Sequence, residues 1–129
     1  MMDQPSVLEL VDAVRAFLET RAMPELTGHT AFHARVAANA LGIVSRELKL
    51  GPQLAAEEKQ RLVGLLGVAA PLDSLNRELC RRIREETVGL DTPGLKDHLI
   101  ATTRGKVMID QPTYSGLKRM PAGGGDEGP

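Results

Sequence analysis

The side chains best suited to recognition or chemistry lie in residues 31–48, where one predicted helix carries an imidazole, two guanidiniums and an amide. At about 100° per residue, His33 falls near the centre of the apolar arc, so we expect its side chain to be buried. Arg35, Asn39 and Arg46 fall where this arc meets the opposite face. This polar edge either bonds locally and reaches into water, or it binds a partner or ligand.

The same helical wheel assigns the other side chains of the segment to two faces. The larger apolar side chains fall within one half-circle, which we predict to face the protein core. This inward face carries Val36, Ala37, Ala40, Leu41, Ile43, Val44 and Leu48. The opposite face, which we predict to face solvent, carries Ala38, Gly42, Ser45 and Lys49.

Three histidines are the minimum protein ligand set of a catalytic zinc site. His29 and His33 are four residues apart, and His98 lies far along the chain. The pair lacks the glutamate of an HExxH motif, and Cys80 has no CxxC partner. We therefore predict no metal and no other cofactor, with the histidines in isolated structural or surface positions. Cys80 is predicted to be a buried, unreactive thiol rather than a nucleophile.

A cluster of hydroxyls and cations lies near the end of another predicted helix. Thr102, Thr103, Arg104 and Lys106 could together hold a phosphate. The best anion site of a helix is its N-terminus, however, and cations at the opposite end can simply interact with the helix dipole. The spacing of a P-loop is also absent.

Composition narrows the class of protein. The 129 residues include 16 Lys and Arg against 17 Asp and Glu, and the sequence pI is about 6.3. This balance lacks the basic surface of a nucleic-acid-binding protein. Aromatic residues make up only 2%, too few for a base-stacking platform or a membrane aromatic belt. A single cysteine, no signal-peptide pattern and no apolar run of about 20 residues predict a cytoplasmic protein that does not bind membranes.

Five helices are expected to position these groups. Ser6 and Glu9 have the spacing of a capping box, and Pro24 is expected to stop the first helix. Gly51 and Pro52 are expected to separate the second helix from the third. The predicted helices span residues 6–21, 30–50, 54–66, 72–87 and 91–109, the last with Pro93 at its first position. The predicted inward rows are Val7, Val11, Val14 and Leu18 in the first helix, and Leu72, Leu75, Leu79 and Ile83 in the fourth.

No segment alternates as a strand would, and the connections are short. We therefore predict an all-α protein, a single-domain up-and-down bundle of about five helices that spans residues 5–120. Pro112 is expected to give this domain an extended C-terminal arm that contains Tyr114. The arm either lies on its own bundle or docks on another protein. Residues 121–129 are expected to form a disordered glycine-rich tail.

Three segments resemble a small bacterial family catalogued as domain of unknown function 6285. They are FHARVAANAL with the following REL, LNRELCRRIR, and HLIATTRGKVMIDQPTYSG, and they lie in residues 32–48, 75–84 and 98–116. The resemblance extends from about Pro5 to Arg119. It implies a short all-helical protein, encoded beside acyl-CoA dehydrogenases and aminoglycoside-phosphotransferase-like kinases, in a family without agreed catalytic residues.

Together, the residues and the resemblance lead us to expect an accessory, non-catalytic subunit or interaction module. The resemblance implies a partner, either a phosphotransferase-like kinase acting on hydroxyacyl-CoA intermediates of fatty or hydroxy acid catabolism, or an acyl-CoA dehydrogenase. One alternative is an acyl-CoA-binding protein or small enzyme, with His33 as base and the Thr102 cluster for phosphate. Another is a homo-oligomeric helical scaffold. The candidate contact residues are His33, Arg35, Asn39, Arg46, Arg82, Thr102, Lys106, Pro112 and Tyr114.

Overall fold

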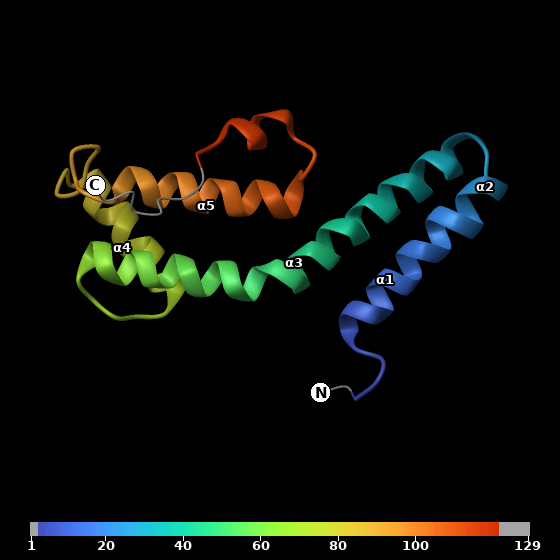
Figure 1. The fold of residues 1–129 in the computed structure, drawn as a ribbon, viewed down its shortest axis with the longest axis horizontal. Coiled ribbons are helices and arrows are strands. Elements are labelled where there is room, and N and C mark those ends of the chain that lie inside the picture. Colours follow the sequence, from blue (N-terminus) through green and yellow to red (C-terminus); the bar gives the residue numbers. More distant parts are fainter. Residues whose placement is uncertain (1–2, 122–129) are drawn as a thin grey trace, which may run out of the picture. The chain divides into compact units, whose positions relative to one another are not determined.

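The computed structural model describes residues 3–121, and every regular element in this range is helical (Figure 1). The prediction of an all-α protein is therefore confirmed for this part of the chain. Of the predicted tail 121–129, all but Pro121 lies outside the described residues. The elements are α1 (Val7–Phe17), the π-helix η1 (Leu18–Ala22), α2 (Met23–Glu25), α3 (Gly28–Leu66), α4 (Leu72–Arg84), α5 (Leu95–Asp110) and the 3-10 helix η2 (Ser115–Arg119).

The predicted second and third helices are one continuous helix, α3, so the expected five long helices are corrected to four. Gly51 and Pro52 lie inside α3 and do not end it. A proline in a helix interior removes one hydrogen bond and crowds the preceding turn, at a cost of roughly 3 kcal/mol. Leucine, lysine, glutamine and alanine flank the pair, and these strong helix formers continue the helix on both sides.

The predicted capping box at the start of α1 is confirmed. The Ser6 hydroxyl accepts from the Glu9 backbone N–H at 3.2 Å, and the Glu9 carboxylate accepts from the Ser6 N–H at 2.7 Å. The predicted stop at Pro24 was wrong, because the helical backbone continues from η1 through this proline, in the first turn of α2, and ends at Glu25. The chain reverses only after Glu25, and Gly28 begins α3 with a φ of 63°, a conformation that glycine adopts readily.

The structure divides into two compact units, one ending at Pro52 and the other beginning at Gln53. The first unit consists of α1, η1, α2 and residues 28–52 of α3. The second consists of the rest of α3, α4, α5 and η2. Within residues 3–121, no helix is both long and apolar enough to cross a membrane.

In the first unit, α1 and residues 28–52 of α3 run side by side as a helical hairpin (Figure 1). The α3 residues buried between them are Ala38, Gly42 and Ser45, the face that the helical wheel assigned to solvent. The Ser45 hydroxyl donates to a carboxylate oxygen of Asp12 on α1 at 2.6 Å, and the Lys49 ammonium lies 3.4 Å from the other oxygen. Small side chains let two helix backbones approach closely, which explains why this face is buried.

The close approach at Ala38 leads to a prediction about stability. Ala38 is 2% exposed, so leucine at this position has no room and must push α1 away from α3. Ala38→Leu is expected to destabilise the first unit by about 1–3 kcal/mol. Faster amide hydrogen exchange in α1 would show this loss. The matched control is Ala40→Leu, because Ala40 is exposed on the same helix. Equal exchange in the two variants would contradict the prediction.

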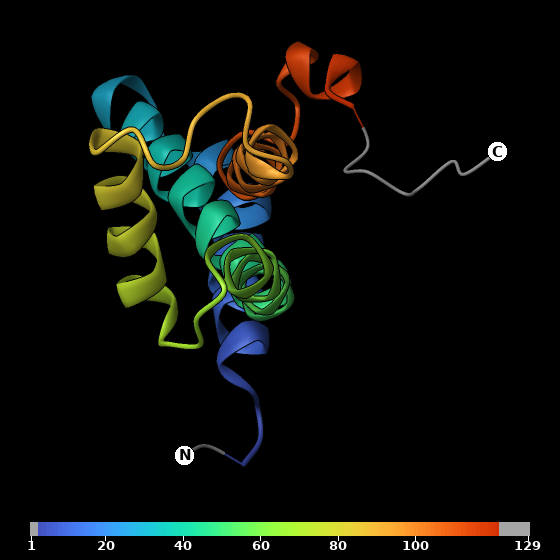
Figure 2. The ribbon, with the colours of Figure 1, turned by 90° about the vertical axis from the view of Figure 1, so that its left-hand side faces the viewer.

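The hydrophobic core described by the structure belongs to the second unit. Leu75 and Leu79 of α4 are buried as predicted, whereas Ile83 is exposed because α4 reaches the end of its last turn there. Figure 2 shows α4 crossing the second half of α3 and α5, which lie side by side and are seen end on. The buried apolar residues of this core are Leu62, Leu66, Leu75, Leu79, Val88 and Leu95.

Three boundaries in the second unit differ from the predictions. Helix α4 ends at Arg84 rather than Thr87, and a reversal follows in which Glu86 has a φ of 60°. Helix α5 begins after Gly94, whose left-handed φ of 89° makes it the capping residue in place of the predicted Pro93 start. The C-terminal arm, which was predicted to be extended, is a turn followed by the 3-10 helix η2. The Arg104 guanidinium ties η2 to α5 by donating to the Leu117 carbonyl at 3.2 Å.

Candidate functional site

The candidate contact residues divide between the two units. His33, Arg35, Asn39 and Arg46 lie on α3 in the first unit. The second unit holds the remaining candidates, namely Arg82 on α4, Thr102 and Lys106 on α5, and Pro112 and Tyr114 before η2. The candidate set is therefore two groups, each positioned by its own unit.

His33 is exposed, so the expectation that it is buried was wrong. Its ring contacts that of Phe32 edge to face, with centroids 5.6 Å apart. The helical wheel failed here because it took the most apolar face as the buried one. The hairpin instead buries the face with the smallest side chains, and the apolar arc around His33 remains open.

The first unit consequently exposes an apolar surface, which we call the hairpin surface. On α1 the exposed side chains recur at steps of three and four residues and form one stripe. On α3 they recur at multiples of four, so they spread over about 160° of the helix from Phe32 to Leu48. Of the predicted inward row of α1, Val11 and Leu18 are partly buried, but Val7 and Val14 belong to this exposed stripe. The hairpin surface consists of Val7, Leu10, Val14 and Phe17 of α1 with Phe32, Val36, Val44 and Leu48 of α3.

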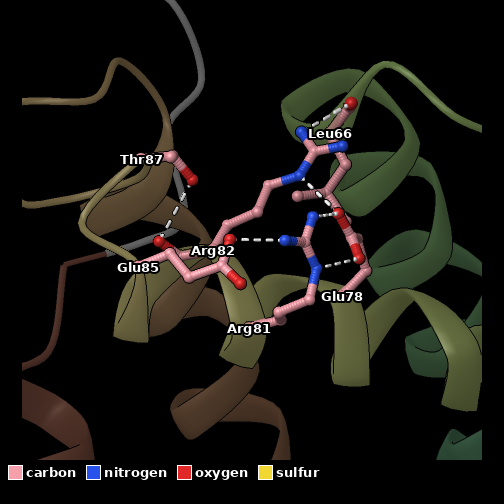
Figure 3. Close-up of polar contacts among 6 residues, drawn as sticks. All are labelled: Leu66, Glu78, Arg81, Arg82, Glu85 and Thr87. Atoms are coloured by element: carbon pink, nitrogen blue, oxygen red, sulfur yellow. Dashed lines mark hydrogen bonds and ion pairs between the residues drawn. The ribbon is translucent and has the colours of Figure 1, made fainter.

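Arg82 has internal partners. Figure 3 shows its guanidinium between α3 and α4, donating to the Leu66 carbonyl at 2.9 Å and to the Glu78 carboxylate at 2.7 Å. Arg81 donates to the same carboxylate and also contacts Glu85. Hydrogen bonds from these two arginines lower the pKa of Glu78 to about 2, and the bond from Arg81 has the larger effect. Arg82 thus links the end of α3 to α4 by hydrogen bonds. The spacing of residues in the sequence does not reveal this link.

A second polar cluster joins α3 to α5 in the second unit. The Arg61 guanidinium donates through Nε to Nδ1 of His98 and through Nη2 to the Thr102 hydroxyl, each at 3.3 Å. His98 is only 3% exposed, and burial, followed by the positive charge of Arg61, lowers its pKa. Sequence reasoning missed this cluster because Arg61 lies 37 residues from His98 and stands in a charged stretch that resembles a solvated surface.

This cluster makes the stability of the second unit depend on pH. Because the folded state lowers the pKa of His98 below its ordinary 6.5, the unfolded chain binds the proton more readily. The stabilisation is complete above pH 6.5 and is lost as the pH falls through the folded pKa. We expect the free energy of unfolding to decrease over this window in urea titrations. His98→Gln should flatten the dependence, whereas His33→Gln, at an exposed position, should not. A decrease that survives His98→Gln would contradict this origin.

The predicted cluster on α5 does not form one site. Thr102 and Arg104 are partly buried and bond to Arg61 and Leu117 respectively, while Thr103 and Lys106 are exposed. A cleft of about 590 Å³ lies beside them in the second unit, between α3 and α5. Its lining residues are Leu54, Glu57, Gln60, Arg61, Asp97, Ala101, Arg104, Gly105 and Met108.

The structure also locates Cys80, the groups that could bind a metal, and Tyr114. Cys80 is exposed on α4, so the expectation of a buried thiol was wrong; the buried face of this helix is formed by Leu75 and Leu79. Within residues 3–121, no three His, Cys, Asp or Glu side chains gather as a metal site would require. Tyr114 is 53% exposed at the start of η2, so its ring is accessible to a partner.

Comparison with known protein families relates the chain to one of them. A family described as Domain of unknown function (DUF6285) matches residues 24–114, a span that includes all of α3, α4 and α5. No curated protein and no solved structure matches the chain.

Proposed function

Because the chain belongs to the DUF6285 family, we propose that it is a non-catalytic accessory subunit of an aminoglycoside-phosphotransferase-like kinase. The kinase would act on hydroxyacyl-CoA intermediates of fatty or hydroxy acid catabolism. The class of partner is the one that the resemblance to this family implies. The proposed mode of binding comes from the first unit.

The hairpin surface is the observation that carries this proposal. A hairpin whose fully buried side chains are all small gains little hydrophobic free energy, since the gain is about 25 cal/mol per Å² of apolar surface. The largest apolar patch on a typical monomer covers about 300–600 Å², and such patches often mark binding sites. A stable interface covers about 800 Å² on each partner, so it needs an apolar patch of this size at its centre. The eight large apolar side chains exposed on these two neighbouring helices offer the apolar contact area that such an interface needs.

The polar edge of α3 supports the same assignment. Arg35, Asn39 and Arg46 lie beside Phe32 on the helical wheel, so they would form the rim of an interface centred on Phe32 and Val36. Arginine is enriched at the residues that contribute most to binding, because its guanidinium can hold a carboxylate in two parallel hydrogen bonds. We therefore expect the kinase to contribute carboxylates opposite this edge.

Co-expression tests the proposal directly. The chain is produced with a kinase of this class from the same organism, and in a second culture with an acyl-CoA dehydrogenase, with the affinity tag on the chain. We expect the kinase to elute with the chain in a fixed ratio after size-exclusion chromatography. Elution of the chain without the kinase, with the kinase fully active in the unbound fraction, would contradict the proposal. Co-elution of the dehydrogenase alone would contradict the choice of partner.

A further inference from the structure

The cleft between α3 and α5 has the size of a small-molecule site, and it is lined by both apolar and charged side chains. Its volume of about 590 Å³ lies within the range of about 300–1,000 Å³ that is typical of ligand pockets. Leu54, Ala101 and Met108 give it an apolar wall. The two helices pack closely where they meet beside the cleft: Gly105 packs against Leu54, and a Cβ on Gly105 would lie 3.3 Å from that leucine.

Two arginines in this cleft are oriented by neutral acceptors. Arg61 donates to His98 and Thr102, and Arg104 donates to the Leu117 carbonyl. Within the described residues neither arginine forms an ion pair, in contrast to Arg81 of α4. A guanidinium has five N–H donors, so both arginines retain donors for a ligand while their positions are already fixed.

The carboxylates of the cleft limit the charge of that ligand. Glu57 and Asp97 line the same cleft, so its four charged side chains sum to zero. Glu57 accepts from the side-chain amide of Gln53 at 2.7 Å. A ligand with several negative charges would be repelled by these two carboxylates, whereas a single carboxylate can lie against the arginines. A neutral apolar molecule would leave the arginine donors without a new acceptor.

We propose that this cleft binds a small amphipathic monocarboxylate, with its carboxylate on Arg61 and Arg104 and its apolar chain on Leu54, Ala101 and Met108. His98 and Thr102 are positioning residues that hold Arg61 in place. The site lies wholly in the second unit, so it does not depend on the hairpin surface or on the proposed kinase.

Calorimetric titration of the full chain with octanoate tests the site, with octanol and inorganic phosphate as comparison ligands. We expect saturable heat with octanoate alone. Arg104→Gln should weaken octanoate binding at least tenfold, because it removes a charge-assisted hydrogen bond. Arg84→Gln, at an exposed position of α4 outside the cleft, should leave the affinity unchanged.

A second variant guards against misfolding. Ala101→Leu fills the cleft and keeps both arginines, so it should abolish octanoate binding while thermal unfolding shows a folded chain. Absence of saturable heat with octanoate up to about 10 mM would overturn the proposal. It would also be overturned if octanol bound as well as octanoate, or if folded Ala101→Leu bound octanoate as the native chain does.

Discussion

Replacing Phe32 and Val36 together by aspartate is expected to weaken kinase binding at least a hundredfold. The two side chains are 59% and 48% exposed, and they lie one turn apart on α3 within the hairpin surface. Each substitution removes apolar contact area and forces the complex to bury a carboxylate without a partner. A hundredfold loss corresponds to about 2.7 kcal/mol, the size expected when residues at the centre of an interface are disrupted. Fluorescence anisotropy with a labelled chain would measure the affinity.

The fold must survive these substitutions for the result to be informative. Because both positions are exposed, the free energy of unfolding should change by no more than about 0.5 kcal/mol. Leu99→Asp is the control, since Leu99 is also a half-exposed apolar residue but lies on α5 in the second unit. Unchanged affinity in the folded double variant, or an equal loss in Leu99→Asp, would rule out the hairpin surface as the docking face.

Leu75→Ala is expected to destabilise the second unit by about 2–5 kcal/mol. Leu75 is 0% exposed and belongs to the buried core that α4 shares with Leu62 and Leu66 of α3. The substitution leaves a cavity among the other buried core side chains, which relax only partially around it. Native-state hydrogen exchange in α4 and α5 would measure the loss for this unit alone. The control is Leu90→Ala, at a side chain that is 83% exposed, with an expected change within about 0.5 kcal/mol. A similar loss in both variants would contradict this description of the core.

Local sequence signals predicted the helices well where side chain and backbone interact over a few residues. The Ser6 capping box is an example, because both of its hydrogen bonds span three residues. The Leu75 and Leu79 row of α4 is another, since large apolar residues there do face the core. The Gly51 and Pro52 stop was wrong because helix formers on both sides outweigh one lost hydrogen bond.

The candidate site was less predictable, since it depends on which faces meet. Periodicity places Ala38 and Ser45 on one face of α3, but it cannot show that α1 packs against small residues and leaves Phe32 exposed. Asp12 of α1 accepts a hydrogen bond from Ser45 and so helps to determine which face of α3 is buried, but it lies 33 residues away in the sequence. The Arg61 and His98 pair is equally remote in sequence, so only the folded chain brings it together.

Hydrogen exchange of the chain with and without the purified kinase tests the central claim most directly. The account predicts saturable binding, with slowed amide exchange in residues 7–17 and 28–52, which carry the hairpin surface. Exchange in residues 53–121 should change far less. No saturation at any accessible kinase concentration, or protection confined to residues 53–121, would contradict the claim that the first unit is a recognition surface.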